Sequence, residues 1–267
     1  RKMLECLQGE GHIYGLDVDP IEIVKTTDRL RKAGYGEDIL TIIQQNFRNI
    51  DLVAEEHGLF DFVLADLGVS SMQIDNPKRG FSFKTDGPLD PRLNQETGIS
   101  AARRLDTISR EKLAGMLCEN SDEPYCEELA KAITDEIRRG NHIDTTTKLR
   151  QVIEKTLDFL PEKEKKETIK KTCQRTFQAL RIDVNHEFEV LYEFMEKLPD
   201  ALRPGGRVAI LTFHSGEDKL VKKALKSGYK EGIYSDYAKD VIRPSAKECT
   251  QNPRARSTKM RWAIKAE

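Results

Sequence analysis

Apolar and polar positions in the first third of the chain form short apolar runs separated by helical spacings. The runs at residues 12–19, 39–47 and 62–66 predict three short strands with polar ends, and the run at 62–66 has almost no alternation, which predicts burial on both faces. Pro20 predicts the first turn of a helix capped by Asp19, and a shorter helix follows the second strand. Strands alternating with helices at this pitch predict right-handed crossovers and a parallel sheet.

The pattern changes between residues 98 and 175, where helical spacings occur without a convincing strand. Ser109 predicts a helix N-cap, Gly140 predicts a helix end, and Asp144 or Thr145 predicts the next start. This segment is expected to be a small helical domain inserted into an α/β domain formed by residues 1–97 and 176–267.

The α/β pattern resumes near residue 176. Apolar residues spaced three or four apart predict one long helix over 177–198, with a separate polar stripe made of Arg175, Gln178, Arg181 and Asn185. The turn at 203–206 leads into a strand at 207–214, a helix at 216–225 and a last strand at 257–266.

Polar groups are predicted at three strand ends on the same edge of one sheet, namely Asp17, Asp66 and His214. A carboxylate at the position of Asp17 could accept hydrogen bonds from ribose hydroxyls or could cap the next helix. Phe47, after Asn46, could pack beside a base or belong to the core.

Composition narrows the class of protein. Charged residues make up 33% of the 267 residues, and no apolar run reaches the roughly 20 residues that a transmembrane helix needs. The N-terminus lacks the apolar core of a signal peptide, which favours a cytoplasmic protein. The five cysteines form no CxxC pair, so buried or incidental thiols are expected rather than disulfides or zinc.

Basic residues are clustered although the net charge is −1. Such clusters can bind a phosphate backbone or can simply be solvated faces. One cluster follows the strand at 207–214 and one lies at the C-terminus: Lys219, Lys222, Lys223 and Lys226, and Arg254, Arg256, Lys259, Arg261 and Lys265.

Several motifs resemble one known family. These are LADLGVSSMQID, RGFSF, DGPLDPRLN, RTFQALRIDVNHE, ILTFHSGED and NPRARS followed by KMR. They are similar to the motifs of the MraW/RsmH family, S-adenosylmethionine-dependent methyltransferases that modify the exocyclic N4 of a cytidine in the decoding region of 16S ribosomal RNA. The resemblance runs from about residue 12 to the C-terminus and includes the helical segment.

The resemblance implies a Rossmann-like class I methyltransferase sheet that binds S-adenosylmethionine. Carried over by motif, Asp17 would hold the ribose, Phe47 would pack beside the adenine, and Asp66 and Gln73 would line the site near the methyl group. Asp66 is the expected catalytic residue, either as the acceptor of the N4 proton or through cofactor orientation. The reaction implies no metal ion.

The expected partner is 16S ribosomal RNA or the small ribosomal subunit, with no membrane. The RNA must present an unstacked base. The residues expected to contact it are Arg181, Asn185, His214, Ser215, Arg254 and Arg256. Whether the chain acts as a monomer or a homodimer stays open.

Three departures from the family modify these expectations. No strand with a glycine-rich loop precedes residue 12, so a truncated chain is expected. The family's DMRMD reads DPRLN at 90–94, and its FHSLEDR reads FHSGEDK at 213–219. The alternatives are a family member acting on another nucleic acid or a small molecule, and a non-catalytic protein that binds RNA or ribosomes.

Overall fold

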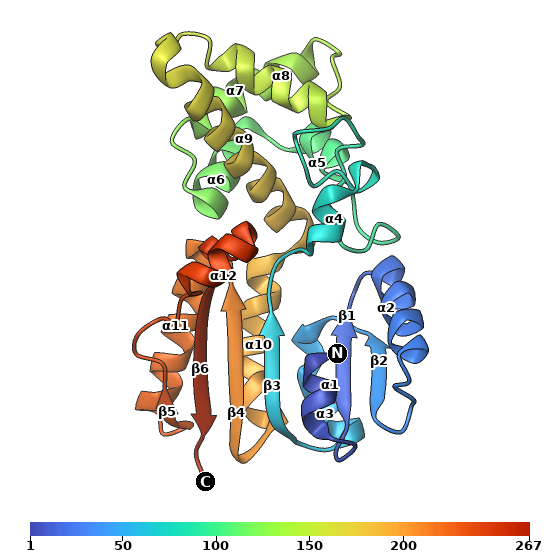
Figure 1. Ribbon diagram of the computed structural model, residues 1–267. Coiled ribbons are helices and arrows are strands. Elements are labelled where there is room, and N and C mark those ends of the chain that lie inside the picture. Colours follow the sequence, from blue (N-terminus) through green and yellow to red (C-terminus); the bar gives the residue numbers. More distant parts are fainter. The chain divides into compact units, whose positions relative to one another are not determined.

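The computed structural model of the protein describes residues 1–267, which divide into two compact units. The first unit contains residues 1–67 and 189–267, and the second contains residues 68–188. All six strands belong to the first unit, whereas the second consists of helices and loops (Figure 1). The chain is therefore a mixed α/β protein.

The first unit begins with three strands that alternate with helices, as the sequence predicted. Its N-terminal elements are α1 (Lys2–Leu7), β1 (Ile13–Asp17), α2 (Pro20–Lys32), β2 (Leu40–Gln44), α3 (Ile50–His57) and β3 (Phe60–Asp66). Its C-terminal elements are α10 (Glu187–Ala201), β4 (Leu202–Thr212), α11 (Ser215–Lys230), β5 (Tyr234–Tyr237), α12 (Ala246–Gln251) and β6 (Lys259–Lys265). The first two residues of α10 belong to the second unit.

The strands form two sheets, not the single sheet that the sequence predicted. One sheet pairs β1 with β2 in parallel, and the other has the order β3-β4-β6-β5. In the second sheet β3 and β4 are parallel, and β6 runs antiparallel to both β4 and β5. The two sheets are separate because no backbone hydrogen bonds connect β1 with β3 (Figure 1).

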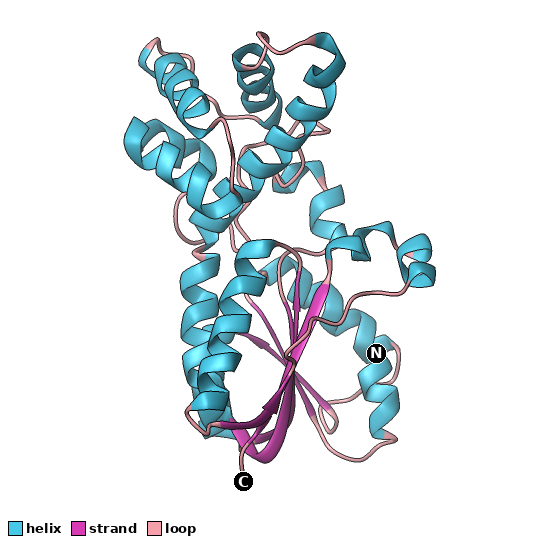
Figure 2. Ribbon diagram, turned by 90° about the vertical axis from the view of Figure 1, so that its left-hand side faces the viewer, coloured by secondary structure: helices cyan, strands magenta, loops and turns pink.

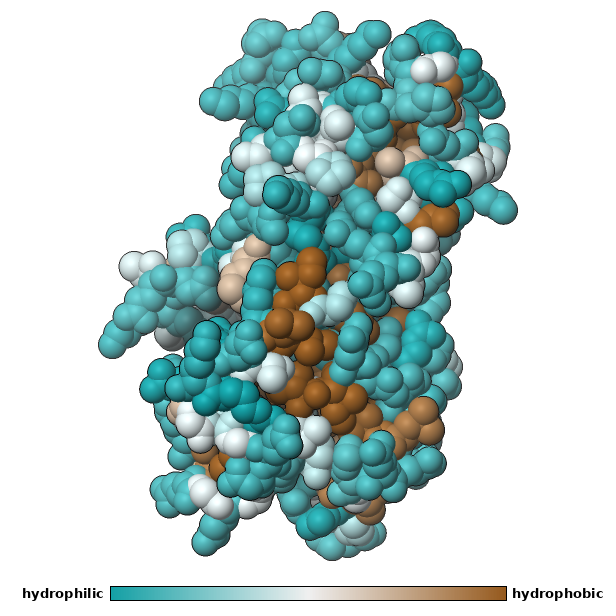
Figure 3. Space-filling view, turned by 90° about the vertical axis from the view of Figure 1, so that its right-hand side faces the viewer, coloured by the Kyte–Doolittle hydropathy of each residue, from teal (hydrophilic) through white to brown (hydrophobic).

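Strand β3 is less buried than its apolar sequence predicted. Phe62 is 48% exposed and Leu64 is 42% exposed, whereas Val63 is buried. Phe62 and Leu64 lie on the same face of β3 and Val63 on the other, because successive side chains of a strand alternate between the faces. Strand β4, which is paired along both edges, buries Val208 and Ile210 fully. Figure 3 shows a hydrophobic area exposed on the surface of the first unit.

Helices cover the strands of the first unit (Figure 2). Helices α3, α10 and α11 supply apolar side chains to a core shared with the four-stranded sheet. Its members include Ile50, Leu191, Phe194, Leu198, Val221, Leu225, Val208 and Ile210. A smaller cluster of Leu4, Leu30 and Leu40 holds α1 and α2 against β2.

The second unit contains most of the helices that the sequence predicted between 98 and 175. They are α5 (Ala101–Thr107), α6 (Arg110–Ser121), α7 (Cys126–Arg138), α8 (Thr146–Thr156) and α9 (Glu162–Asn185), and the short helix α4 (Ser71–Asp75) precedes them. The expected N-cap Ser109 is confirmed, and Thr145 is the cap of the two alternatives Asp144 and Thr145, since each of these side chains, Ser109 and Thr145, accepts a backbone hydrogen bond in the first turn. None of the protein's helices has both the length and the apolar character that crossing a bilayer requires.

The prediction of a single helix over 177–198 is wrong. Helix α9 ends at Asn185 and α10 begins at Glu187. Between them His186 adopts a left-handed conformation with φ of 52°. A non-glycine residue in this region interrupts the α-helical hydrogen-bond series, so the apolar stripe continues on two helices.

Candidate functional site

The predicted residues lie in two pairs at the carboxyl ends of parallel strands, Asp66 with His214 and Asp17 with Phe47. In the register of β3 with β4, Asp66 lies opposite Leu211, so His214 follows at the carboxyl end of the neighbouring strand. In the register of β1 with β2, Asp17 lies opposite Gln44, three residues before Phe47. Figure 1 shows these strands pointing the same way within the first unit. Ligands of α/β proteins bind at such carboxyl ends.

Asp17 and Asp19 have different roles at the end of β1. Asp19 is fully buried and caps α2 by accepting hydrogen bonds from the backbone N–H groups of Ile21 and Glu22. Asp17 is exposed, and its Oδ1 accepts from the backbone N of Asp19 at 2.9 Å. Partial burial of the carboxyl group raises the pKa of Asp17. Because a carboxylate accepts about four hydrogen bonds, Asp17 retains capacity for a ligand.

Phe47 opens a short 3₁₀ helix, η1 (Phe47–Asn49), after β2. The side chain of Asn46 caps this turn by accepting from the backbone N of Arg48 at 3.1 Å. The Phe47 ring is half-buried and meets Phe194 of α10 edge-on, with ring centroids 5.2 Å apart. Phe47 is therefore anchored in the core while part of its surface remains accessible.

Asp66 ends β3 with an exposed carboxyl group that accepts no hydrogen bond from the protein. Partial loss of hydration raises its pKa, and no neighbouring charge opposes this shift. Leu67 is buried, and its N–H continues the pairing with Leu211 at 3.1 Å. The backbone thus holds Asp66 firmly, although its side chain lacks a protein partner.

Gln73 lies in the second unit and is 5% exposed. The side-chain oxygen of Gln73 accepts from the backbone N–H of Ser70 at 2.8 Å. The backbone N–H of Gln73 donates to the Ser70 hydroxyl at 3.2 Å. This capping box begins α4. The sequence pattern S-x-x-Q could have identified this local role.

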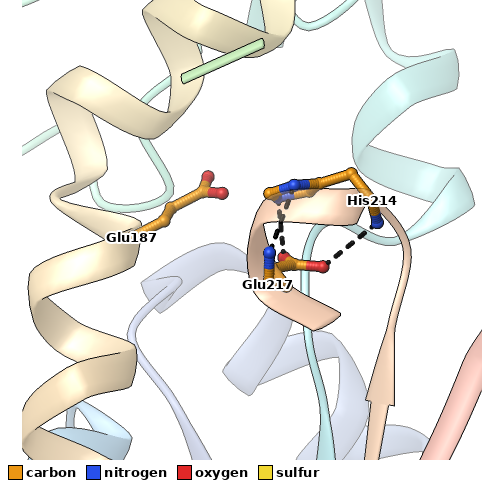
Figure 4. A group of neighbouring side chains, drawn as sticks. All are labelled: Glu187, His214 and Glu217. Carbon is orange, nitrogen blue, oxygen red and sulfur yellow. Dashed lines mark hydrogen bonds and ion pairs between the residues drawn. The ribbon is translucent and has the colours of Figure 1, made fainter. Parts of the chain in front are cut away.

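His214 and Glu217 form a reciprocal cap at the start of α11 (Figure 4). Glu217 is 3% exposed, and its carboxylate accepts from the backbone N of Phe213 at 2.8 Å. The Nε2 atom of His214 lies 3.2 Å from Oε1 of Glu217. The histidine ring thus contributes to the helix start, which places it beside the carboxyl end of β4.

Three other predicted residues of the first unit are exposed. Ser215 is the first residue of α11. Arg254 and Arg256 lie in the short 3₁₀ helix η3 (Pro253–Ser257). Arg256 has no ion-pair partner within the protein, so its charge is available to a ligand.

Arg181 and Asn185, near the end of α9, make contacts within the second unit. Arg181 donates two hydrogen bonds to Glu187, at 2.8 and 2.9 Å. Asn185 accepts from the backbone N of Leu93 at 2.8 Å and donates to the carbonyl of Pro91 at 2.9 Å. Asn185 therefore fixes the segment that carries the DPRLN motif.

The remaining members of the polar stripe contact the end of α6. Gln178 donates to the carbonyl of Asn120 at 3.5 Å, and Arg175 lies 4.0 Å from the buried carboxylate of Glu123. Burial raises the pKa of Glu123. The helical spacing correctly predicted a shared face, but these residues use that face for internal contacts.

Ion pairs that join β6 to α11 were not predicted from the sequence. Arg261 is 4% exposed, and its Nε atom donates to Asp218 at 2.7 Å. Lys259 lies 3.4 Å from the same carboxylate. Burial alone would raise the pKa of Asp218, but the hydrogen bonds and charges of Arg261 and Lys259 outweigh it and lower the pKa. The C-terminal basic cluster is therefore partly neutralised.

Comparison with known proteins identifies the family. The sequence model of the MraW methylase family matches residues 1–266. The chain is 79% identical over 267 residues to ribosomal RNA small subunit methyltransferase H 1 of Agathobacter rectalis, covering all of this chain and 76% of that protein. It is 73% identical over 266 residues to the protein of the same name from Lachnoclostridium phytofermentans, and the match covers 100% of this chain and 73% of that protein. It is 38% identical over 252 residues to ribosomal RNA small subunit methyltransferase H of Prochlorococcus marinus, and the match covers 94% of this chain and 79% of that protein. The chain belongs to the MraW methylase family.

Proposed function

We propose that this chain transfers a methyl group from S-adenosylmethionine to the exocyclic N4 of a cytidine in 16S ribosomal RNA. Membership of a methylase family and the names of the relatives support the reaction and the RNA class. The observation that carries the proposal is Asp66, a carboxylate at a strand end that has a raised pKa and no hydrogen-bond donor from the protein.

The first unit offers groups that suit an adenosine ligand. Asp17 has acceptor capacity for the two ribose hydroxyls, since only part of it is used by the backbone of Asp19. Phe47 keeps an accessible part of its ring for the adenine. Gln73 is the predicted fourth residue of this set, and its place in the cofactor site stays a prediction.

Adenosylmethionine supplies an activated methyl group on a sulfonium. The protein then has to align the acceptor and exclude water. Cytosine N4 is a poor nucleophile because its lone pair is delocalised into the ring. A carboxylate that accepts a hydrogen bond from the amino group favours the reactive geometry and can take the proton at its oxygen. We assign this role to Asp66, because a raised pKa makes its carboxylate a better base.

The RNA contacts follow from exposure and charge. Arg254 and Arg256 lie exposed on η3, where they suit phosphate groups. His214 and Ser215 lie beside the strand that neighbours Asp66. Asn185 would act by shaping the DPRLN segment, and Arg181 would act from its pair with Glu187 at the end of α9. The helical domain at 98–175 would recognise the substrate, and the enzyme would act in the cytoplasm.

The finer part of the fold is a proposal as well. The parallel pair β1–β2 and the order β3-β4-β6-β5 are consistent with two parts of one methyltransferase sheet. A strand hydrogen-bonded to the free edges of both β1 and β3 would join them, and its side chains would lie beside Phe62 and Leu64.

The test measures transfer of a labelled methyl group to small ribosomal subunits that lack the modification. The variant Asp66→Ala should lose about 100-fold or more in rate, the usual contribution of a positioned acid or base. Its stability should change by less than about 0.5 kcal/mol because Asp66 is an exposed side chain without partners.

Asp61→Ala is the matched control, since Asp61 is an exposed carboxylate near the opposite end of β3. This variant should keep wild-type activity. Near-normal transfer by Asp66→Ala would remove Asp66 from the chemistry, and no transfer by the wild-type chain would contradict the proposed function.

A further inference from the structure

Helix α11 carries a row of lysines along one face. The row begins at Lys219 and ends at Lys230, and all its members are exposed. Residues three and four positions apart lie next to one another on a helix surface. The members of this lysine row follow that spacing throughout: Lys219, Lys222, Lys223, Lys226 and Lys230.

No carboxylate of the protein neutralises the lysine row. The two acidic residues of α11 are both engaged elsewhere, since Glu217 is buried in the helix cap and Asp218 is held by Arg261. None of the five lysines forms an ion pair. Helix α9 differs, because its Lys165 pairs with both Asp158 and Glu162.

The row therefore concentrates positive charge on a protein whose net charge is −1. At a rise of 1.5 Å per residue, it extends over about 16 Å. Like charges at these spacings repel and destabilise a helix, unless a counter-charge faces them. Packing of Val221, Leu225 and Gly228 into the unit holds the helix in place, so the five lysines stay next to one another on its surface.

An aromatic side chain adjoins the row. Tyr229 is 42% exposed, and the centroid of its ring lies 5.0 Å from the ring centroid of Tyr237. Single-stranded nucleic acids bind to surfaces that combine lysines for the backbone with aromatic rings on which bases stack. A membrane-binding helix would need exposed apolar residues opposite its basic face, whereas the apolar face of α11 is buried.

We propose that the lysine row of α11 binds the phosphate backbone of the ribosomal RNA, away from the nucleotide that is methylated. This inference rests on the proposed function for the identity of the RNA. Lysines act as point charges, so the contact fixes the position of the RNA strand without reading its sequence.

The test replaces four lysines of the row by glutamine, as Lys219→Gln, Lys222→Gln, Lys223→Gln and Lys226→Gln, in the intact chain. Binding to 16S ribosomal RNA that lacks the methyl group is measured between 50 and 200 mM salt. Each phosphate contact contributes roughly 0.7 to 0.9 to the slope of log K against log salt, so the slope should fall by about 3.

The matched control removes the same charge from two other helices of the first unit. The substitutions Lys2→Gln, Lys25→Gln, Arg29→Gln and Lys32→Gln in α1 and α2 also change exposed basic residues. The control should keep the wild-type slope, as should a version of the row with four arginines, which preserves charge. At saturating RNA the row variant should keep kcat, while its KM for RNA rises.

An unchanged salt slope in the row variant would overturn the inference. So would a loss of binding to vesicles that contain phosphatidylglycerol with unchanged RNA binding, since the row would then be a membrane contact. Failure of the proposed function looks different, because the wild-type chain would bind RNA through the row but transfer no methyl group.

Discussion

Replacing Arg261 by methionine tests whether the ion pairs between β6 and α11 are structural. The change removes two hydrogen bonds to Asp218 and one to the carbonyl of Ala238. It leaves a carboxylate that is only 13% exposed with Lys259 as its remaining partner, at 3.4 Å. Loss of one partner from a buried pair costs about 3–5 kcal/mol. We expect the lower end, about 3 kcal/mol at pH 7, because Lys259 remains.

The pH dependence of this loss is also predicted. The lowered pKa of Asp218 in the folded protein means that the pair stabilises the fold above the unfolded pKa, and this contribution disappears as the pH falls through the folded pKa. In the variant, burial without Arg261 should raise the pKa of Asp218 instead. The difference in unfolding free energy should therefore be largest near neutral pH and should shrink as the pH falls below about 4, near the pKa of an unperturbed Asp.

Chemical denaturation of the wild type and of Arg261→Met at several pH values measures this difference. Arg203→Met is the control, since Arg203 pairs with Asp61 at 3.2 Å while both side chains are more than half exposed. Such a pair contributes about 0–1 kcal/mol. A loss at Arg261 no larger than at Arg203, or a loss that does not change with pH, would refute the reasoning.

Two further predictions concern the strand ends and the motif at 90–94. Asp17→Ala should weaken adenosylmethionine binding by roughly 10- to 100-fold in calorimetry, because it removes charged hydrogen bonds. Asp19→Ala should instead lower the unfolding free energy by about 1 kcal/mol, because it removes the helix cap. Equal effects of the two changes on binding would argue against a ribose contact. Asn185→Ala should cost about 1–3 kcal/mol in denaturation because it leaves backbone groups of the DPRLN segment without partners; unchanged stability would show that this segment does not depend on Asn185.

The sequence predicted those features of the fold that depend on neighbouring residues. Asp19 and Ser109 were recognised as N-caps, and Thr145 as one of two candidates, because a cap needs only a short polar side chain before a helix. The strands that end at Asp17 and Asp66 were recognised from their apolar runs. These local signals were sufficient to place candidate ligand-binding residues at strand ends.

Features that depend on distant neighbours could not be predicted in this way. Exposure of Phe62 and Leu64 depends on which elements pack against their face of β3, which no pattern within the strand reveals. The break at His186 has no glycine or proline to mark it. Strand β5 has only four residues, and it depends on pairing with β6.

The candidate site shows the same division. Helical spacing placed Arg181 and Asn185 on one face, but only the structure shows that Asn185 holds Pro91 and Leu93. The pair of Arg261 with Asp218 joins residues 43 positions apart. Long-range polar contacts of this kind depend on the whole fold, so no local sequence pattern predicts them.

The most direct test of the central claim is mass analysis of nucleosides from small ribosomal subunits that lack the modification, after incubation with this chain and adenosylmethionine. The account predicts that one new nucleoside, cytidine methylated at N4, appears in 16S ribosomal RNA. A methyl group on another atom or base, or no methylated nucleoside at all, would contradict it.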